Sequence, residues 1–377
     1  MKQKIQIVIL FSVLFGLSNC KKAENDILYN KKYVKEIKEA RKELGQFLAS
    51  NFIPGASVAV MKDGEIIYSE GLGWASRDLE VRANRKTKFR IGGSSELFTN
   101  IIYQKLVEEG KLNPDSSIQH YYPQFPQKEY KISLQNLAQK TSGLRDATLK
   151  ERNWHAINIT SEKGLDVFKD DPLATEPGLY QTESPYHYNV LGVVMEKVAA
   201  MNYYKLLEHY ITDTLNLTNT SIDNPLTTIK DRSNFFDQNY IAQVVNAETY
   251  DLRYQAASNG ILSNAEDLAK FGSALINSDY LAKETKDKLW EPTPLFNDIP
   301  SRMANGWMLF IDNSGRKIYG RTSSVIGGSS SIIIYPEENL IIAYACNLTG
   351  SMDKTPVFEV AMHFLPEAKE KAATNEE

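Results

Sequence analysis

The stretch Phe89-Arg90-Ile91-Gly92-Gly93-Ser94-Ser95-Glu96-Leu97-Phe98-Thr99 leads from a tight turn into a buried helix. Apolar residues then recur at helical spacing, at Leu97, Phe98, Ile101, Ile102 and Leu106. The helix is expected to begin at Gly93 and to end at Glu108-Glu109-Gly110, because a glycine after the last apolar position is a common helix stop. We expect the first turn of this helix to lie at the functional cleft.

Strand patterns lie at both ends of the chain. Residues 56–61 and 65–70 are typical of two strands, and Lys62-Asp63-Gly64 between them is a strong hairpin signal. The sequence therefore predicts an α/β fold of the α+β type, in which one antiparallel sheet is built from both chain ends, flanked by helices and interrupted by a helical insertion. The later elements are expected as strands at residues 305–311, 317–319, 329–335 and 340–346, and a last helix at 357–365.

The same pattern divides the chain into segments. The sheet domain is expected to comprise residues 36–111 and 251–365, with a helical domain at 112–250. Residues 20–35 are polar and charged and are expected to form a tether. The tail, residues 366–377, is rich in charged and small residues and is expected to be disordered.

The N-terminus, residues 1–19, is typical of an export signal. Lys2 and Lys4 precede an apolar run at residues 5–17, which is too short for a spanning helix. The segment Leu17-Ser18-Asn19-Cys20 resembles a bacterial lipobox, which predicts acylation of Cys20 and a lipid-anchored protein of the bacterial cell envelope. The alternative is a plain signal peptide with an incidental cysteine. Removal of the two lysines would move the formal net charge from −4 to −6 (−4 − 2).

Composition limits the classes of partner. The net charge of −4 is mild and no block of lysine and arginine is present, so nucleic acid is not an expected partner. The one other cysteine, Cys346, lies in an apolar run and is expected to be a small buried residue without a disulfide. No metal or cofactor is expected, because no ligand spacing is present among the histidines His120, His155, His187, His209 and His363.

Several segments together resemble one known family. They match the β-lactamase-related serine hydrolases and penicillin-binding proteins of the class C β-lactamase type over roughly residues 36–365. The resemblance implies a β-lactamase/transpeptidase-like fold. Besides the opening stretch, it is carried by Pro54-Gly55-Ala56-Ser57-Val58-Ala59-Val60, Leu106-Val107-Glu108-Glu109-Gly110-Lys111-Leu112, Leu137-Ala138-Gln139-Lys140-Thr141-Ser142-Gly143-Leu144 and Asn259-Gly260-Ile261-Leu262-Ser263-Asn264-Ala265-Glu266-Asp267-Leu268.

The three catalytic elements that the resemblance implies are all altered. Gly93-Ser94-Ser95-Glu96 stands where Ser-x-x-Lys is expected, so both the nucleophile and the lysine are replaced. Glu183-Ser184-Pro185 stands where Tyr-Ser-Asn is expected, and Gly320-Arg321-Thr322-Ser323 stands where Lys-Thr-Gly or Gly-His-Thr-Gly is expected. Lys140-Thr141-Ser142-Gly143 looks like a Lys-Thr-Gly element, but its neighbours place it in the Thr-Ser-Gly-Leu turn of the family's Leu-x-x-His-Thr-Ser-Gly-Leu motif, where Lys140 stands at the histidine position.

These losses predict a degenerate, catalytically inactive centre, because glycine supplies no atom that could form a covalent intermediate. The cleft is expected to persist as a binding site, with Arg321, Thr322, Glu183 and Glu96 as ligand-binding candidates. The expected ligand is a peptidoglycan-derived or carboxylate-bearing molecule, or a protein partner.

Other interpretations stay open at this point. Ser94 or Ser95 could act as a displaced nucleophile in an active peptidase, esterase or β-lactamase, or could cap the helix. Glu96 could be placed by the helix dipole. Glu96 and Glu183 could form an acid/base or cation-binding pair, or one of them could pair with Arg321. His187 is a candidate base, and the fold could also serve only as the scaffold of a surface antigen.

Overall fold

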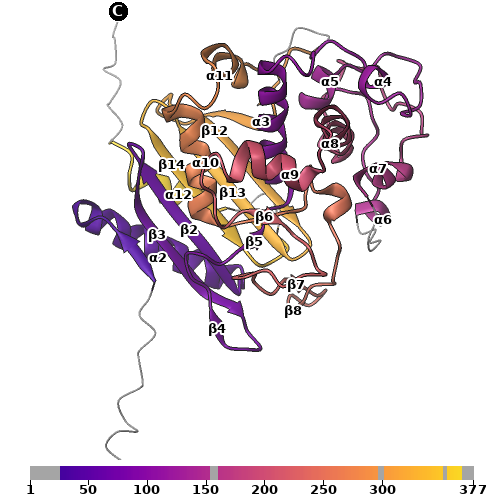
Figure 1. Ribbon diagram of the computed structural model, residues 1–377. Helices are drawn as coiled ribbons and strands as arrows, with labels where there is room; N and C mark the ends of the chain where they lie inside the picture. The colour runs from indigo at the N-terminus through magenta and orange to yellow at the C-terminus, as the bar shows by residue number, and fades with distance from the viewer. Residues whose placement is uncertain (1–25, 153–159, 296–300, 351–354, 367–377) are drawn as a thin grey trace, which may run out of the picture.

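The computed structural model describes residues 26–152, 160–295, 301–350 and 355–366 (Figure 1). The expected signal peptide, the Cys20 anchor and nearly all of the expected tail lie outside these residues. Within the described ranges, no helix combines the length and the apolar character needed to cross a membrane.

One antiparallel sheet is built from both ends of the chain, which confirms the predicted fold class. The N-terminal hairpin pairs with the last strand, so that Val60 lies opposite Ile342, and the C-terminal strands continue the sheet from there. The strand order is β1 (Ile27–Tyr29), β3 (Glu65–Ser76), β2 (Gly55–Lys62), β14 (Leu340–Cys346), β13 (Gly328–Tyr335), β12 (Lys317–Val325), β11 (Trp307–Ile311) and β10 (Met303–Ala304).

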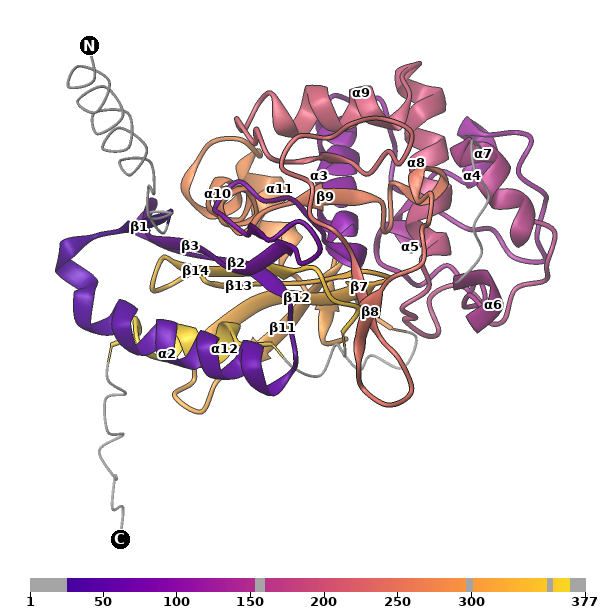
Figure 2. The ribbon, with the colours of Figure 1, turned by 90° about the horizontal axis from the view of Figure 1, so that it is seen from below.

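The two faces of the sheet are covered by different helices. Successive side chains of a strand point to opposite faces, so on β14 Leu340 and Ile342 join one apolar cluster while Ile341 and Ala343 join the other. The first cluster is closed by α2 (Val34–Ser50) and α12 (Val357–Met362), which lie together on one side of the sheet in Figure 2. The second is closed by α3 (Ser95–Glu108) and α10 (Ala265–Asn277).

The middle of the chain adds a helix-rich region beside α3. Its longest helix, α8 (Tyr186–Ala199), packs against α3 and shares its apolar cluster (Figure 1). Short strands also occur there, including the hairpin of β7 (Phe236–Gln238) and β8 (Val244–Asn246). The remaining α-helices and strands of the described chain are α4 (Ile118–Tyr121), α5 (Leu134–Ala138), α6 (Leu149–Arg152), α7 (Ser161–Gly164), α9 (Tyr203–Leu207), α11 (Lys283–Leu289), β4 (Val81–Arg82), which pairs with β3, and the small sheet of β5 (Phe89–Arg90), β9 (Ile261–Ser263) and β6 (Ser221–Ile222).

Several element boundaries differ from the predictions, and two of the differences have a clear cause in the structure. Part of the expected tether is folded: β1 pairs with the edge of β3, and η1 (Lys31–Tyr33) leads into α2. A three-residue edge strand has no apolar alternation long enough to be seen in sequence. The strand expected at 317–319 extends to Val325, because its polar half forms backbone pairs with β13 while Arg321 and Ser323 face the cleft.

Candidate functional site

The entry to α3 places Gly93 beside β12. A 3-10 turn, η2 (Gly92–Ser94), precedes the helix, which begins at Ser95 rather than at Gly93. Gly93 N–H donates a hydrogen bond of 2.5 Å to Ser323 Oγ. A Cβ atom added at Gly93 would lie 2.9 Å from Ser323 Oγ and 3.2 Å from Arg321 Nη2. The space next to Gly93 is therefore already occupied by two side chains of β12.

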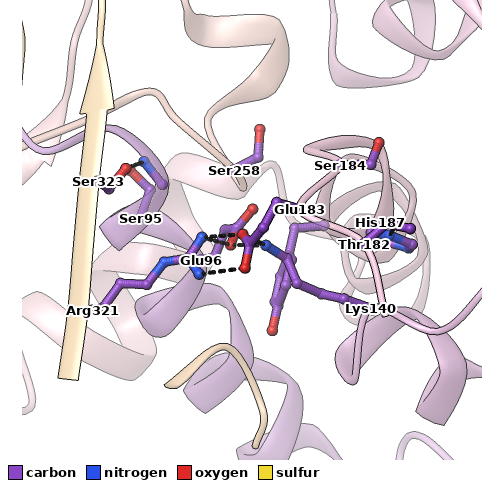
Figure 3. Close-up of polar contacts among 12 residues, drawn as sticks. Ser95, Glu96, Lys140, Thr182, Glu183, Ser184, His187, Ser258, Arg321 and Ser323 are labelled. Carbon is purple, nitrogen blue, oxygen red and sulfur yellow. Dashed lines mark hydrogen bonds and ion pairs between the residues drawn. The ribbon is translucent and has the colours of Figure 1, made fainter. Parts of the chain in front are cut away.

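Four charged side chains meet in front of Gly93 (Figure 3). Lys140 Nζ lies 2.7 Å from Glu96 Oε2 and 2.7 Å from Glu183 Oε2. Arg321 Nη2 lies 2.8 Å from Glu96 Oε2 and 2.9 Å from Glu183 Oε2, and Arg321 Nη1 donates to Glu183 Oε1 at 3.2 Å. Each carboxylate thus faces both cations, and the group is neutral as a whole. We call these four residues the charge cluster.

The charge cluster is buried except on one side. The side chain of Lys140 is 0% exposed, that of Glu96 is 3% exposed and that of Arg321 is 7% exposed, whereas that of Glu183 is 45% exposed. Buried charges are costly unless they are paired, and removing one partner of such a pair typically destabilises a protein by about 3–5 kcal/mol. The mutual pairing of four charges is what allows them to stay in this interior position.

The pKa shifts of the two carboxyl groups reflect their different burial. For Glu183, burial acts to raise the pKa, but the nearby Arg321 and Lys140 outweigh it and hold the pKa well below its usual range. For Glu96, burial is the larger effect and raises the pKa, while Lys140 and Arg321 oppose the rise. Burial lowers the pKa of Arg321, yet the two carboxylates more than compensate and raise it above its ordinary value.

His187 holds the loop that carries Glu183. Its Nδ1 lies 2.8 Å from Ser142 Oγ and its Nε2 lies 2.8 Å from Thr182 Oγ1. Burial, with a contribution from Lys140, lowers the pKa of His187 to about 3, so the imidazole is neutral near pH 7. Both ring nitrogens are engaged and the side chain is fully buried, so the ring joins two loops instead of acting as a base in the cleft.

Ser94 and Ser95 both point away from the charge cluster. Ser94 Oγ lies 2.8 Å from Ser330 Oγ, and Ser95 Oγ accepts a hydrogen bond of 3.2 Å from the backbone N–H of Ile261. Both residues are fully buried, and among the described residues neither hydroxyl has a basic side chain as a hydrogen-bond partner. Ser94 occupies the N-cap position without a capping hydrogen bond, so the expected capping role is wrong for its side chain.

The match to a family model extends over residues 40–361 and bears the description Beta-lactamase. The chain belongs to the beta-lactamase family. The human serine beta-lactamase-like protein LACTB, mitochondrial, is 24% identical over 421 residues, which cover 82% of this chain and 76% of LACTB. Protein flp of Staphylococcus aureus (strain NCTC 8325 / PS 47) is 24% identical over 315 residues, which cover 80% of this chain and 61% of flp.

Solved structures give the same fold. FmtA from Staphylococcus aureus superposes with a TM-score of 0.74 at 17% identity, covering 91% of this chain and 93% of that chain. A class C beta-lactamase superposes with a TM-score of 0.74 at 17% identity, covering 89% and 98% of the two chains. At this identity the likeness establishes the fold.

The three elements that differ from the beta-lactamase family pattern lie together in the structure. Glu96 from the first element, Glu183 from the second and Arg321 from the third are in direct contact. Ser323, in place of the family's glycine, provides the hydroxyl that binds Gly93 N–H. The predicted pairing of a carboxylate with Arg321 is therefore present for both glutamates, and Lys140 Nζ also contacts both.

Lys140 belongs to the site although it was not among the residues predicted from the sequence. It lies in the Thr-Ser-Gly-Leu turn as expected, at φ +60°, and its ammonium group reaches into the charge cluster. A signal was present, because the family motif carries histidine at this position and this chain carries lysine. A new cation beside two new carboxylates is the pattern that would have identified it.

Two further predicted residues lie outside the charge cluster, and the side chain of Thr322, next to Arg321 on β12, lies on the opposite face of the sheet. Thr322 Oγ1 lies 2.9 Å from Ser331 Oγ and has no contact with a glutamate among the described residues. Pro185 precedes α8 and lines a neighbouring cavity of about 210 Å³. Asn189, Gln255, Asn259, Ser324 and Val325 also line this cavity.

Proposed function

We propose that this chain is a non-hydrolytic member of the beta-lactamase family that acts by binding, and that it is carried as a lipid-anchored protein of the bacterial cell envelope. One observation carries the proposal of inactivity. At the position of the family nucleophile, Gly93 has no hydroxyl, and its N–H group and side-chain space are occupied by Ser323 and Arg321.

Acyl transfer needs a nucleophile, a group that takes its proton, and N–H donors aimed at the developing oxyanion. Gly93 supplies no nucleophile, and Glu96, which replaces the family lysine, is held between two cations. The Gly93 N–H donates to Ser323 Oγ and so has a partner within the chain. All three requirements argue against hydrolysis at this centre.

The cavity beside the charge cluster is the better candidate for binding. Arg321 already faces Glu96 and Glu183, so a ligand carboxylate could reach it only if the half-exposed Glu183 moved aside. The cavity of about 210 Å³ instead offers the amide side chains of Asn189, Gln255 and Asn259 next to apolar groups. Amide groups match the hydrogen-bonding groups of a peptide, which supports a peptidoglycan-derived peptide as the ligand class.

Covalent probes test the absence of hydrolysis. The full chain is incubated with a fluorescent penicillin and with a fluorophosphonate, and adducts are mapped by mass spectrometry. No adduct is expected. An adduct on Ser94 or Ser95 that disappears in Ser94→Ala or Ser95→Ala would show that the chain is a serine hydrolase with a displaced nucleophile, and the proposal would be wrong.

A cavity-filling variant tests binding. Val325→Trp should fill the cavity and weaken the binding of soluble peptidoglycan stem peptides at least tenfold in calorimetric titrations. Ile311→Trp is the matched control, because Ile311 is exposed on β11 and does not line this cavity. Equal binding by the two variants would place the ligand elsewhere.

A further inference from the structure

A row of lysines occupies one exposed face at the start of the described chain. Lys35, Lys38 and Lys42 lie in α2 at spacings of three and four residues, which places them on the same side of the helix, and Lys31 lies just before this helix in η1. All four are exposed, and none makes an ion pair within the part of the chain that the structure describes. We call these four residues the lysine row.

Helix stability does not account for the lysine row. Positive charges near a helix N-terminus are unfavourable, because the helix dipole places partial positive charge there, and Lys31 and Lys35 flank the start of α2. Packing does not account for it either, since Ile37, Ala40 and Leu44 form the buried face of this helix. The glutamates of α2, Glu36, Glu39 and Glu43, make no ion pair with the row among the described residues, so its positive charges stay unpaired in a chain whose net charge is −4.

The row lies close to the predicted lipid anchor. The described chain is fixed to the fold from its first residue, because Asp26 Oδ1 accepts a hydrogen bond of 3.0 Å from Arg85 Nε and β1 then pairs with β3. Six residue steps separate Cys20 from Asp26. A fully extended chain of that length spans about 20 Å at most, so an acylated Cys20 would keep this edge of the fold near the bilayer.

We propose that the lysine row docks on an anionic membrane surface and fixes the orientation of the anchored protein. This inference rests on the proposed lipid anchor. Anionic headgroups complement the row in charge, and the attraction acts within a screening length of about 10 Å. Figure 2 shows α2 on one side of the sheet, whereas α3, which carries Glu96, lies against the other face. Docking through α2 therefore turns the charge cluster away from the membrane.

Headgroup quenching tests the orientation. The mature full-length lipoprotein is placed in nanodiscs of phosphatidylcholine with or without phosphatidylglycerol, and a fluorophore is attached through Gln46→Cys, four residues beyond Lys42 on α2. Native Cys346 is buried. Spin-labelled headgroups should quench this probe at least twofold more in the anionic discs, and high salt should remove the difference. A probe at Leu149→Cys, exposed on α6, should be quenched in neither.

Charge variants complete the test. The triple variant Lys35→Gln, Lys38→Gln and Lys42→Gln should lose the extra quenching seen in the anionic discs. Arginine at the same three positions should retain it. The matched control is Lys283→Gln, Lys286→Gln and Lys288→Gln on α11 (Lys283–Leu289), which changes net charge equally and should leave quenching unchanged. If the Gln46→Cys probe in an anchored protein were quenched equally in both lipids, or not quenched at all, the docking would be refuted and the lipid anchor would still stand. A mature chain without acyl groups on Cys20 would overturn the anchor and, with it, the docking.

Discussion

The sheet core and the charge cluster are both buried, yet they are held together by opposite means. On β14, Ile341 belongs to an apolar cluster in which many buried side chains pack against one another. In the charge cluster each glutamate depends on the same two cations. Apolar packing is distributed, whereas ionic packing depends on a few partners, so the two regions should respond differently to single substitutions.

The largest effect is expected from breaking the charge cluster at Arg321. Arg321→Met leaves Glu96 and Glu183 with only Lys140 as a counter-ion, and the loss of one partner from a buried ionic group typically costs about 3–5 kcal/mol. Urea unfolding followed by circular dichroism measures the change. The control Lys283→Met removes an exposed ion pair with Asp287 and should leave stability unchanged. A loss as small for Arg321→Met as for the control would refute the structural role of the cluster.

A substitution in the sheet core, with a slightly smaller expected loss of stability, provides the comparison with the charge cluster. Ile341→Ala removes buried methyl groups that approach Gly272 and should reduce the free energy of unfolding by about 3 kcal/mol. This loss should be the same at pH 5 and pH 8, because no titratable group is changed. A marked pH dependence would mean that the sheet core and the charge cluster are coupled.

The sequence predicted the first region better than the second. The continuous apolar run of β14 and the hairpin signal between β2 and β3 identified the sheet, because a strand that is covered on both faces is apolar throughout. The edge strand β1 was not predicted, since its three residues, two half-buried and one exposed, form too short a pattern. The polar half of β12 was missed for another reason, because Arg321 and Ser323 face the cleft and interrupt the apolar pattern on that face.

The charge cluster was predicted only in part, because its contacts join residues far apart in sequence. The motif comparison placed Glu96, Glu183 and Arg321 in one cleft, and their mutual contact is present. Ser323 was recognised as a replaced glycine, but no sequence pattern specifies that its hydroxyl reaches Gly93 N–H. The position of Lys140 depends on a positive φ in the turn, which only the folded chain defines.

Restoring a side chain at Gly93 should have an intermediate effect. Gly93→Ser places a Cβ 2.9 Å from Ser323 Oγ, and overpacking of this kind typically costs about 1–3 kcal/mol. Adding Ser323→Gly should recover much of the loss, since it removes the atom in conflict. Thermal unfolding of the two single variants and the double variant forms a cycle, and additive losses would show that the two residues do not compete for space.

The same variants distinguish two causes of inactivity, the occupied space beside Gly93 and the absence of a group that can take the serine proton. Neither Gly93→Ser nor the double variant should react with a fluorescent penicillin, because Glu96 in place of lysine cannot take the proton from a new serine while it is held between Lys140 and Arg321. Labelling of the double variant would show that occupied space alone prevents acylation.

The smallest change is expected at the half-exposed member of the cluster. Glu183→Gln removes one carboxylate, but water can reach the vacated position, so the loss near pH 7 should be on the order of 1 kcal/mol. Arg321 and Lys140 hold the pKa of Glu183 below its usual range, so the ionised group stabilises the fold above the unfolded-state pKa of about 4.3. The stability difference between wild type and variant should therefore be constant from pH 8 to pH 5 and shrink as the pH falls below about 4. The exposed Glu129→Gln should follow wild type throughout, and a difference that grew at low pH would contradict the ionic pairing of Glu183.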